Sequence, residues 1–453
     1  MTTVLKAGGS SVADGTKISR ILKQAQGLDD LIVLTVSAQG KTTNRIEKSI
    51  ESAKNGEAVP EPEEIFQEFE SLCIGNRNLT ANGIRDSIYA EFRSLQKPTP
   101  EKLRQLEDPS YTAKLHLDGE RLAAIGVCHI AQCSGLNPLC VDLIGSRFPL
   151  AVKGDYHAGR IDLEESRKRA QQVLSSVKHG ILILPGYGGL DLDRKGPNRI
   201  FRMKTLGRGG SDTAAFGYLY AFQGDRLLIL TDVYGILNAA IEGGETVPVL
   251  DIEEAKDAAS LGAKLPGRRA LRGLEKCYEE GGNPEVYIAH SQDFAGPRTR
   301  IVKETEEKVP VKLVAGRDVV IYSLEGDIRG LQNVLANSGV DWAAGPLTDD
   351  YARVAVSQET DSYAERLITG HRRQDGKNGR RMSKEGNLAF VGAVGSGMYN
   401  TQGIVGRAGT ALGRSGIGVE YNMDPGKVSL GYIIGRNDTT PALVALHGEF
   451  LPP

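Results

Sequence analysis

The chain has 453 residues, of which 40% are hydrophobic and 25% are charged, and its formal net charge is −2 at pH 7. That length allows about two to four domains, and the composition is typical of a globular protein. The small net charge excludes a general basic field for nucleic acid or a membrane surface. Because the sequence has no apolar run long enough to span a bilayer and no signal-peptide pattern at its start, we expect a cytoplasmic protein.

Five cysteines are spread along the chain without a CxxC pair: Cys73, Cys128, Cys133, Cys140 and Cys277. Their odd number and wide spacing predict reduced, mostly buried thiols and no protein-bound metal. The 55 glycines exceed average usage and cluster in motifs. This clustering favours several tight turns or anion sites made by backbone N–H groups.

Short apolar strands and glycine loops alternate at the start of the chain. Thr3–Lys6 is a predicted strand that runs into Ala7–Ser11, and Asp14 is the predicted N-cap of the following helix. Leu31–Val36 is a second buried strand, which ends in the polar loop Ser37–Asn44. This order is typical of a parallel α/β sheet, in which ligands bind at the carboxyl ends of strands.

The next segment, residues 45–130, has a mainly helical pattern. Within it Glu120 and Arg121 stand at the head of an apolar stretch. A glutamate in a first helical turn also interacts favourably with the helix dipole. Simple capping therefore remains the alternative to a binding role for Glu120.

Lys204–Asp212 is the most distinctive stretch, with three glycines, an arginine, a serine and an aspartate before a helix-like run. Glycines let the backbone approach an anion, a helix start presents free N–H groups, and Arg208 offers a forked donor. The alternative is an ordinary glycine loop capped by its own serine or aspartate. Similar strand-to-glycine transitions, Gly180–Gly189 and Arg226–Gly235, flank it.

Several backbone loops combined with Lys6, Arg208 and Lys264 predict a phosphoryl-transfer site. Such chemistry depends on positioning and positive charge more than on covalent catalysis. The sequence has no Walker A motif and no protein-kinase motif set, which argues against those two classes.

Beyond about residue 305 a strand–loop–helix–strand–strand pattern occurs twice, roughly 70 residues apart. Between the copies, His371–Lys384 holds six Lys or Arg residues and one Asp, which predicts a solvated linker or, alternatively, a site for an acidic partner. The predicted elements are Val309–Arg317, Val319–Ser323, Ile328–Asn337 and Tyr351–Ser357 in the first copy, and Leu388–Val394, Gly403–Ser415 and Lys427–Ile434 in the second.

Together these motifs resemble those of the aspartate kinases of the amino-acid-kinase superfamily, in order and over essentially the whole chain. The paired C-terminal units resemble the tandem ACT domains of that family. The matching stretches are Lys6–Val12 (family KFGGTSV), Ser37–Asn44 (SAMGKTTD), Asp118–Leu122, Thr205–Asp212 and Thr231–Gly235 (TDVxG).

The resemblance implies an α/β fold with three domains. A carbamate-kinase-like, three-layer αβα domain with a mainly parallel sheet would cover residues 1–305. Two ferredoxin-like βαββαβ ACT units would cover 306–385, with the basic linker 371–384, and 386–453.

The implied reaction converts L-aspartate and MgATP to 4-phospho-L-aspartate and ADP (EC 2.7.2.4), the first step towards lysine, threonine and methionine-type products. A carboxylate nucleophile is already ionised at neutral pH, so this reaction needs no general base. The ACT pair implies feedback by an amino acid, with lysine or threonine as candidates, and a homodimer or larger assembly. No nucleic-acid or membrane partner is expected.

The resemblance also implies roles for individual residues. The catalytic pair would be Lys6 and Asp212. The aspartate site would comprise Ser37, Thr43, Glu120, Arg208, Gly209 and Ser211. The nucleotide site would comprise Gly8, Gly9, Ser10, Thr231, Asp232 and Lys264. An effector would lie near Asp341, Met398, Gly418 and Glu420.

The departures from the family pattern lie on the nucleotide side. In place of the usual DPR triplet the chain has Ala240, Ile241 and Glu242, so an acid replaces the arginine, and Leu237 stands where a tyrosine is usual. Near polyphosphate this exchange replaces attraction with repulsion. The candidate compensating charges are Lys204, Arg268 and Arg269.

Three hypotheses follow from this pattern. The first is an active aspartate kinase with an altered nucleotide subsite. The alternatives are a non-catalytic, amino-acid-sensing homologue and a kinase for another amino-acid carboxylate in a specialised pathway.

Overall fold

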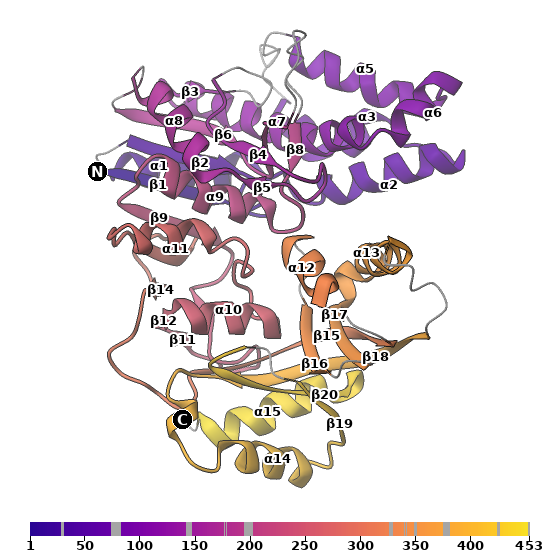
Figure 1. The fold of residues 1–453 in the computed structure, drawn as a ribbon. Coiled ribbons are helices and arrows are strands. Elements are labelled where there is room, and N and C mark those ends of the chain that lie inside the picture. Colours follow the sequence, from indigo (N-terminus) through magenta and orange to yellow (C-terminus); the bar gives the residue numbers. More distant parts are fainter. Residues whose placement is uncertain are drawn as a thin grey trace. The chain divides into compact units, whose positions relative to one another are not determined.

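The computed structural model is shown in Figure 1. It describes residues 1–28, 31–73, 83–141, 147–175, 177, 179–193, 203–325, 329–338, 340, 342–347, 351–374, 381–423 and 426–451. The chain divides into two compact units. Unit 1 comprises Met1–Tyr234 and Arg272–Gly296, and unit 2 comprises Gly235–Leu271 and Pro297–Pro453. No helix in the described ranges is both long enough and apolar enough to cross a membrane.

Unit 1 contains the parallel sheet that the sequence predicts, with neighbouring strands in the order β13-β9-β1-β2-β6-β3. Its central strands are almost wholly buried, as expected of a parallel sheet covered on both faces. The strands are β1 (Thr2–Ala7), β2 (Leu31–Val36), β3 (Leu139–Cys140), β6 (Gly180–Pro185), β9 (Arg226–Thr231) and β13 (Glu285–His290).

Helices pack on this sheet and extend from it. Asp14 caps α1, as predicted, because its side chain accepts a hydrogen bond from Lys17 N at 2.9 Å. Helix α9 is buried along its whole length. The helices on the sheet are α1 (Gly15–Gln26), α7 (Pro109–Cys133) and α9 (Gly210–Ala221), and α8 (Leu163–Leu174) and α11 (Arg272–Glu279) pack on α9.

The mainly helical pattern of residues 45–130 is confirmed. Its helices form an apolar cluster with one side of α7, built around Phe66, Tyr89 and Phe92. The helices are α2 (Thr42–Asn55), α3 (Pro62–Ile65), α4 (Gln67–Cys73), α5 (Ile84–Gln96) and α6 (Pro100–Glu107).

A second, four-stranded sheet of unit 1 has the order β5-β4-β7-β8. Its last strand leads directly into the glycine-rich stretch before α9. The strands are β4 (Ala151–Lys153), β5 (Arg160–Ile161), β7 (Gly188–Asp191) and β8 (Met203–Thr205).

Unit 2 contains a six-stranded antiparallel sheet with the order β16-β17-β15-β18-β20-β19. The sequence predicts two strands between residues 309 and 323, but the structure has one, because β15 pairs with β18 on both sides of Asp318. The strands are β15 (Leu313–Glu325), β16 (Trp342–Leu347), β17 (Tyr351–Ser357), β18 (Met382–Val394), β19 (Val419–Met423) and β20 (Ser429–Gly435). The predicted boundaries at residues 305 and 385 stay predictions, and β18 runs across the second of them.

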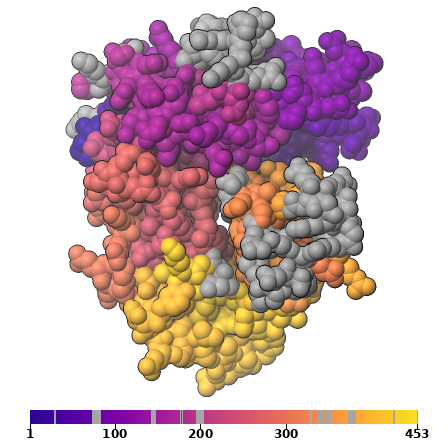
Figure 2. Space-filling model, in the orientation of Figure 1, coloured from indigo at the N-terminus to yellow at the C-terminus, as the bar shows by residue number. Residues whose placement is uncertain are grey.

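Two helices of unit 2 share one face of this sheet. Leu412 of α14 and Leu446 of α15 belong to one apolar cluster with Val391 of β18. Both helices contribute to the surface of the C-terminal residues, coloured yellow in Figure 2. The helices of unit 2 are α10 (Ile252–Leu261), α12 (Arg329–Ser338), α13 (Asp361–Gln374), α14 (Ile404–Arg414) and α15 (Thr439–Phe450).

Unit 2 also contains short strands outside its large sheet. A hairpin pairs β10 (Ile236–Leu237) with β11 (Thr246–Val247), and β12 (Val249–Asp251) runs parallel to β14 (Thr299–Val302). Short 3-10 turns cover Gln358–Thr360, Met398–Asn400 and Arg436–Asp438.

One prediction about the cysteines is wrong. Cys128 on α7 and Cys140 on β3 form a disulfide, with Cα atoms 6.3 Å apart. Residues only 12 apart in sequence were expected to remain separate thiols, but the turn after α7 returns the chain along the helix end. Cys133 and Cys277 are reduced thiols, and Cys133 Sγ lies 3.3 Å from His129 Nε2.

Candidate active site

The carboxyl ends of the central strands of unit 1 lie at one edge of the sheet. In the parallel register Ala7 is opposite Val36, and Val36 is opposite Pro185. Three loops therefore begin side by side, at Gly8, Ser37 and Gly186. Backbone bonds tie them together, since Ser37 N donates to the Ala7 carbonyl at 3.0 Å and Gly186 N to that of Val36 at 2.8 Å.

Lys6 and Asp212 form an ion pair at this edge. Lys6 Nζ lies 2.8 Å from Asp212 Oδ1, and the two side chains are 12% and 23% exposed. Lys6 is the penultimate residue of β1 and Asp212 lies in the first turn of α9, so the pair joins a strand end to a helix start. A partly buried ammonium held beside a helix N-terminus provides positive charge for a phosphoryl group.

The glycines of these loops are required by close packing. A Cβ atom at Gly9 would lie 2.5 Å from the Ala38 carbonyl oxygen, and one at Gly186 would lie 2.9 Å from Ser211 Cβ. The Gly8 backbone lies under Lys6, because a Cβ atom there would be 3.5 Å from Nζ. The structure thus brings the predicted residues Gly8, Gly9 and Ser211 to the same edge as Lys6.

The glycine-rich stretch before α9 uses left-handed backbone twice, at Gly207 (φ 72°) and at Gly209 (φ 64°). This conformation is unfavourable for residues with a Cβ atom. It directs the chain from β8 into the N-terminus of α9 and leaves Arg208 exposed between the two glycines. An exposed guanidinium beside helix N–H groups suits a carboxylate ligand.

Glu120 lies in the middle of α7, so the capping alternative is excluded. The helix begins at Pro109 with Asp108 as its N-cap. The Glu120 side chain is 2% exposed, and its Oε2 has no hydrogen-bond partner within the described part of the chain. Burial raises the pKa of Glu120 to about 8, opposed by hydrogen bonds from the N–H of Ala38 and from its own backbone. A buried carboxyl group with an unused oxygen is suited to receive a cationic ligand group.

This raised pKa predicts a specific pH dependence of stability. The folded protein keeps the Glu120 proton up to about pH 8, whereas the unfolded chain loses it above about pH 4.5. Stability from this group is therefore fully present below about pH 4.5, is lost steadily as the pH rises from there, and the loss is complete once the pH has passed about 8. We expect Glu120→Gln to flatten the pH dependence of the unfolding free energy by about 1.4 kcal/mol per pH unit between pH 5 and 7.5.

Urea unfolding of the substrate-free protein at several pH values measures this slope. Glu51→Gln, at an exposed position of α2, is the matched control and should leave the slope unchanged. Identical slopes for wild type and Glu120→Gln would contradict a buried, protonated Glu120.

The remaining predicted site residues of unit 1 are half-buried or exposed. Ser37 and Thr43 are half-buried, and Ser10 is exposed. The Thr231 hydroxyl shapes its own loop, since Val233 N donates to it at 3.2 Å and it donates to the Val233 carbonyl at 2.9 Å. Asp232 is exposed after the end of β9.

Sequence reasoning missed Tyr187, in the loop after β6. It has a positive φ of 68°, which stores strain in a residue other than glycine. Its ring packs on the start of α9, because a Cβ atom at Gly210 would lie 2.7 Å from Tyr187 Cδ2. Burial, with Glu120 as the next cause, raises the pKa of Tyr187, and Arg208 opposes this rise. The strained aromatic residue thus lies within electrostatic range of Glu120 and Arg208, and its only sequence signal was the Gly-Tyr-Gly-Gly run.

Lys264 lies in unit 2, in the loop after α10. It is exposed. Gly262, which ends the helix with φ 101°, rests on β15, because a Cβ atom there would be 2.7 Å from Arg317 Cβ. The loop that carries Lys264 is therefore fixed to the six-stranded sheet.

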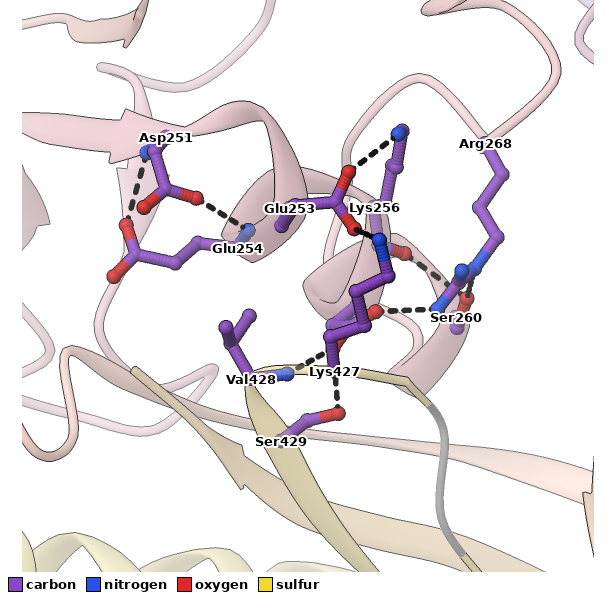
Figure 3. A network of polar contacts seen from close by, with 10 residues as sticks. Asp251, Glu253, Glu254, Lys256, Ser260, Arg268, Lys427, Val428 and Ser429 are labelled. Carbon is purple, nitrogen blue, oxygen red and sulfur yellow. Dashed lines mark hydrogen bonds and ion pairs between the residues drawn. The ribbon is translucent and has the colours of Figure 1, made fainter. Parts of the chain in front are cut away.

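Two buried carboxylates on α10 strengthen this attachment, in the network of Figure 3. Glu254 forms a capping box with Asp251 and accepts from Lys312 Nζ and from Ser396 N, both at 2.8 Å. Asp257 accepts from Val428 N at 2.9 Å.

Asp257 also binds Arg268, one of the candidate compensating charges. The Arg268 guanidinium pairs with Asp257 and donates to Ser260 Oγ at 2.8 Å. An arginine already neutralised by a buried carboxylate adds little positive charge elsewhere, so the compensating role for Arg268 is not supported.

The same argument overturns the interpretation of Lys204. Its side chain is 2% exposed, and Nζ lies 2.8 Å from Asp191 and also pairs with Asp193. The Tyr156 ring centroid is 5.0 Å from Nζ. Lys204 therefore stabilises the β7–β8 sheet, and two carboxylates cancel its charge.

The predicted effector residues lie in unit 2, except that Asp341 is outside the described residues. Met398 is 8% exposed and belongs to the cluster beneath α14 and α15. Gly418 and Glu420 are exposed at the start of β19. In the described ranges, no group of three or more His, Cys, Asp or Glu side chains could hold a metal ion.

Comparison with known proteins extends this description. Residues 1–290 match the model of the amino acid kinase family. An aspartate kinase of Stutzerimonas stutzeri is 24% identical over 99% of this chain and 96% of its own length. An aspartokinase of Pseudomonas aeruginosa is 22% identical over 99% of this chain and 97% of its own length.

The fold prediction is confirmed by the structure of E. coli aspartokinase III in complex with aspartate and ADP. The two structures align over 99% of each chain, with a TM-score of 0.79 and 19% sequence identity. The resemblance to aspartate kinases is thus confirmed in sequence over the full chain. Because the family model covers more than half of its residues, this chain belongs to the amino acid kinase family.

Proposed function

We propose that this protein is an aspartate kinase that transfers the γ-phosphoryl group of ATP to the side-chain carboxylate of L-aspartate. The observation that carries the proposal is Glu120, a buried carboxyl group with an unused oxygen at the edge that also holds Lys6 and Asp212. This group suits an acceptor that carries an ammonium. Full-length similarity to aspartate kinases supports the same substrate class.

The site residues divide between the two ends of the acceptor. Glu120, whose buried carboxyl group gives up its proton when the cation binds, pairs with the α-ammonium of aspartate, and Arg208 binds its α-carboxylate through a forked contact. Ser37, Thr43 and Ser211 complete the pocket through hydroxyl groups. With both α-groups held, the β-carboxylate is the part of the substrate left to react.

The chemical step forms one P–O bond and breaks another. A β-carboxylate oxygen attacks the γ-phosphorus, the bond to the β-phosphate oxygen breaks, and ADP leaves with the electron pair. No proton needs to move. Lys6 offsets the charge that develops on the transferred phosphoryl group, and Asp212 holds Lys6 in position. The N–H groups around Gly8, Gly9 and Gly209 donate hydrogen bonds to the oxygens of the phosphoryl group.

The nucleotide is the other substrate, and Thr231, Asp232, Ser10 and Lys264 are its proposed contacts. Mg²⁺ would enter bound to the phosphates, since phosphate oxygens and one or two carboxylates usually satisfy this ion. Bound in that way, it supplies charge neutralisation to the phosphoryl group. The protein's own residues position the two substrates and exclude water.

Regulation by an amino acid is part of the proposal. E. coli aspartokinase III has been solved with lysine and aspartate, at a TM-score of 0.67. Because the C-terminal units resemble the tandem ACT domains of aspartate kinases, lysine or threonine is the proposed effector, near Asp341, Met398, Gly418 and Glu420. A homodimer or larger homo-oligomer formed through the ACT-like units is the proposed assembly.

A coupled assay for ADP release tests the function. We expect turnover with L-aspartate and MgATP, and lower kcat/KM with glutamate and with β-substituted aspartates. Preference for one of those acids would favour the specialised kinase. No turnover with any nucleoside triphosphate would contradict the proposal and favour the amino-acid sensor, which calorimetry with Mg-nucleotide then tests directly.

A further inference from the structure

Two aromatic residues of unit 1 follow neighbouring strands at the edge described above. Tyr234 comes three residues after the end of β9, and His290 is the last residue of β13. These strands are parallel, with His290 opposite Thr231. Since β9 also pairs with β1, with Leu230 opposite Ala7, both residues lie on the side of the sheet where the Gly8 loop begins.

The two rings are stacked. Their centroids are 4.5 Å apart and their planes are inclined by 15°. The backbone N–H of Gln292 donates to His290 Nδ1 at 3.2 Å, which fixes the plane of the imidazole. Gly296 lies against the tyrosine, because a Cβ atom there would be 2.8 Å from Tyr234 Cε1.

This ordered stack is not buried. Tyr234 is 41% exposed, although it is a large apolar side chain, and His290 is half-buried. A pair that served only to hold the loops together would gain more from full burial. A flat, exposed and pre-oriented aromatic surface suits a planar ligand group, which it binds with little loss of side-chain entropy.

We propose that the Tyr234–His290 stack is the platform for the nucleobase of the phosphoryl donor. This inference rests on the proposed kinase function. It assigns a binding surface to the nucleobase, which is the part of the nucleotide that the glycine loops and Lys6 do not contact. Those groups recognise phosphate through charge and N–H donors, whereas the platform contributes aromatic surface. The base stacks on the exposed part of the Tyr234 ring, and His290 supports that ring from behind.

Stacking of this kind discriminates weakly among bases, because every base has a π-face. The platform therefore predicts that KM differs by less than about tenfold between ATP and GTP. Purine nucleotides should bind more tightly than pyrimidine nucleotides, because their bases offer a larger stacking surface. Recognition by hydrogen bonds to one base edge would instead give differences of several orders of magnitude.

The test compares ligands with and without a base on the full chain. Calorimetry measures the affinities of MgADP and of magnesium tripolyphosphate, which has no base, for wild type and three variants. Tyr234→Ala is expected to weaken MgADP about tenfold and to leave tripolyphosphate unchanged. Tyr234→Phe keeps the ring and should retain wild-type affinity for both ligands. Tyr399→Ala, which removes a 70% exposed tyrosine in unit 2, is the control and should change neither.

Kinetics give a second readout that loss of folding would not mimic. Tyr234→Ala should raise KM for ATP about tenfold with kcat nearly unchanged, and KM for aspartate should not move. Wild-type MgADP affinity in Tyr234→Ala would overturn the platform and leave the kinase function standing. Equal losses for MgADP and tripolyphosphate would also overturn it. A wild-type protein that binds no nucleotide would instead contradict the kinase function on which the platform rests.

Discussion

Replacement of Lys6 by alanine is expected to lower kcat for aspartate phosphorylation about a thousandfold. Lys6 Nζ is held 2.8 Å from Asp212 Oδ1 in a partly buried position, where a positive charge interacts strongly with developing negative charge. Loss of one such preorganised group typically costs two to three orders of magnitude in rate. Because the interaction strengthens only in the transition state, KM for aspartate should change less than tenfold.

Steady-state kinetics with a coupled ADP assay measure this effect. Lys153→Ala is the matched control, since Lys153 also pairs with an aspartate, Asp162 at 3.1 Å, but is 49% exposed and lies away from the sheet edge. It should retain wild-type kcat. Asp212→Asn is expected to fall between the two, because Lys6 remains but is no longer positioned by a carboxylate. A Lys6→Ala variant with more than a tenth of wild-type kcat would exclude Lys6 from the transition state.

Replacement of Arg208 by alanine should lower kcat/KM for aspartate by two to three orders of magnitude, roughly the value of a charge-assisted, forked contact that also orients the substrate. Arg208→Lys keeps the charge without the fork and should recover only part of this loss. Arg226→Ala is the control, because Arg226 pairs with Glu285 where β9 and β13 begin, at the end of the strands away from the site.

A substrate that lacks the α-carboxylate makes the Arg208 experiment specific. β-Alanine keeps the ammonium and the reacting carboxylate of aspartate, so wild type should use it poorly. Arg208→Ala should lose less than about threefold further activity with it. Equal penalties of Arg208→Ala for aspartate and β-alanine would assign Arg208 to another part of the site.

The placement of Lys6, Gly9, Ser211 and Asp212 could be anticipated from sequence because their chemistry is local. Each stands where a buried strand ends or a helix begins, and in a parallel sheet these points converge. The roles of these residues remain predictions, but their gathering at one edge follows from the order of strands and glycine loops alone.

Features that depend on distant partners could not be anticipated. Lys204 looked like an available charge until Asp191 and Asp193 were found to neutralise it. Capping stayed open as an alternative role for Glu120 because the sequence does not reveal that its helix begins eleven residues earlier, at Pro109. The Cys128–Cys140 disulfide likewise depends on how the chain turns after α7.

The nucleotide side illustrates both limits. The sequence shows that Glu242 stands where the family usually has an arginine, and Glu242 is exposed in the hairpin loop of unit 2. No local pattern revealed that Tyr234 stacks on His290, 56 residues later in the chain, because only the pairing of β9 with β13 brings them together. The strain at Tyr187 was equally invisible, since a positive φ is a property of the folded loop.

The central claim is that the side-chain carboxylate of aspartate receives the phosphoryl group, and trapping of the acyl phosphate tests it most directly. Wild-type protein is incubated with MgATP, L-aspartate and hydroxylamine, and the hydroxamate is identified by mass spectrometry with fragmentation. We predict the β-hydroxamate of aspartate in amounts equal to the ADP released, and none with Lys6→Ala. ADP release without a hydroxamate, or a hydroxamate of the α-carboxylate, would contradict the account.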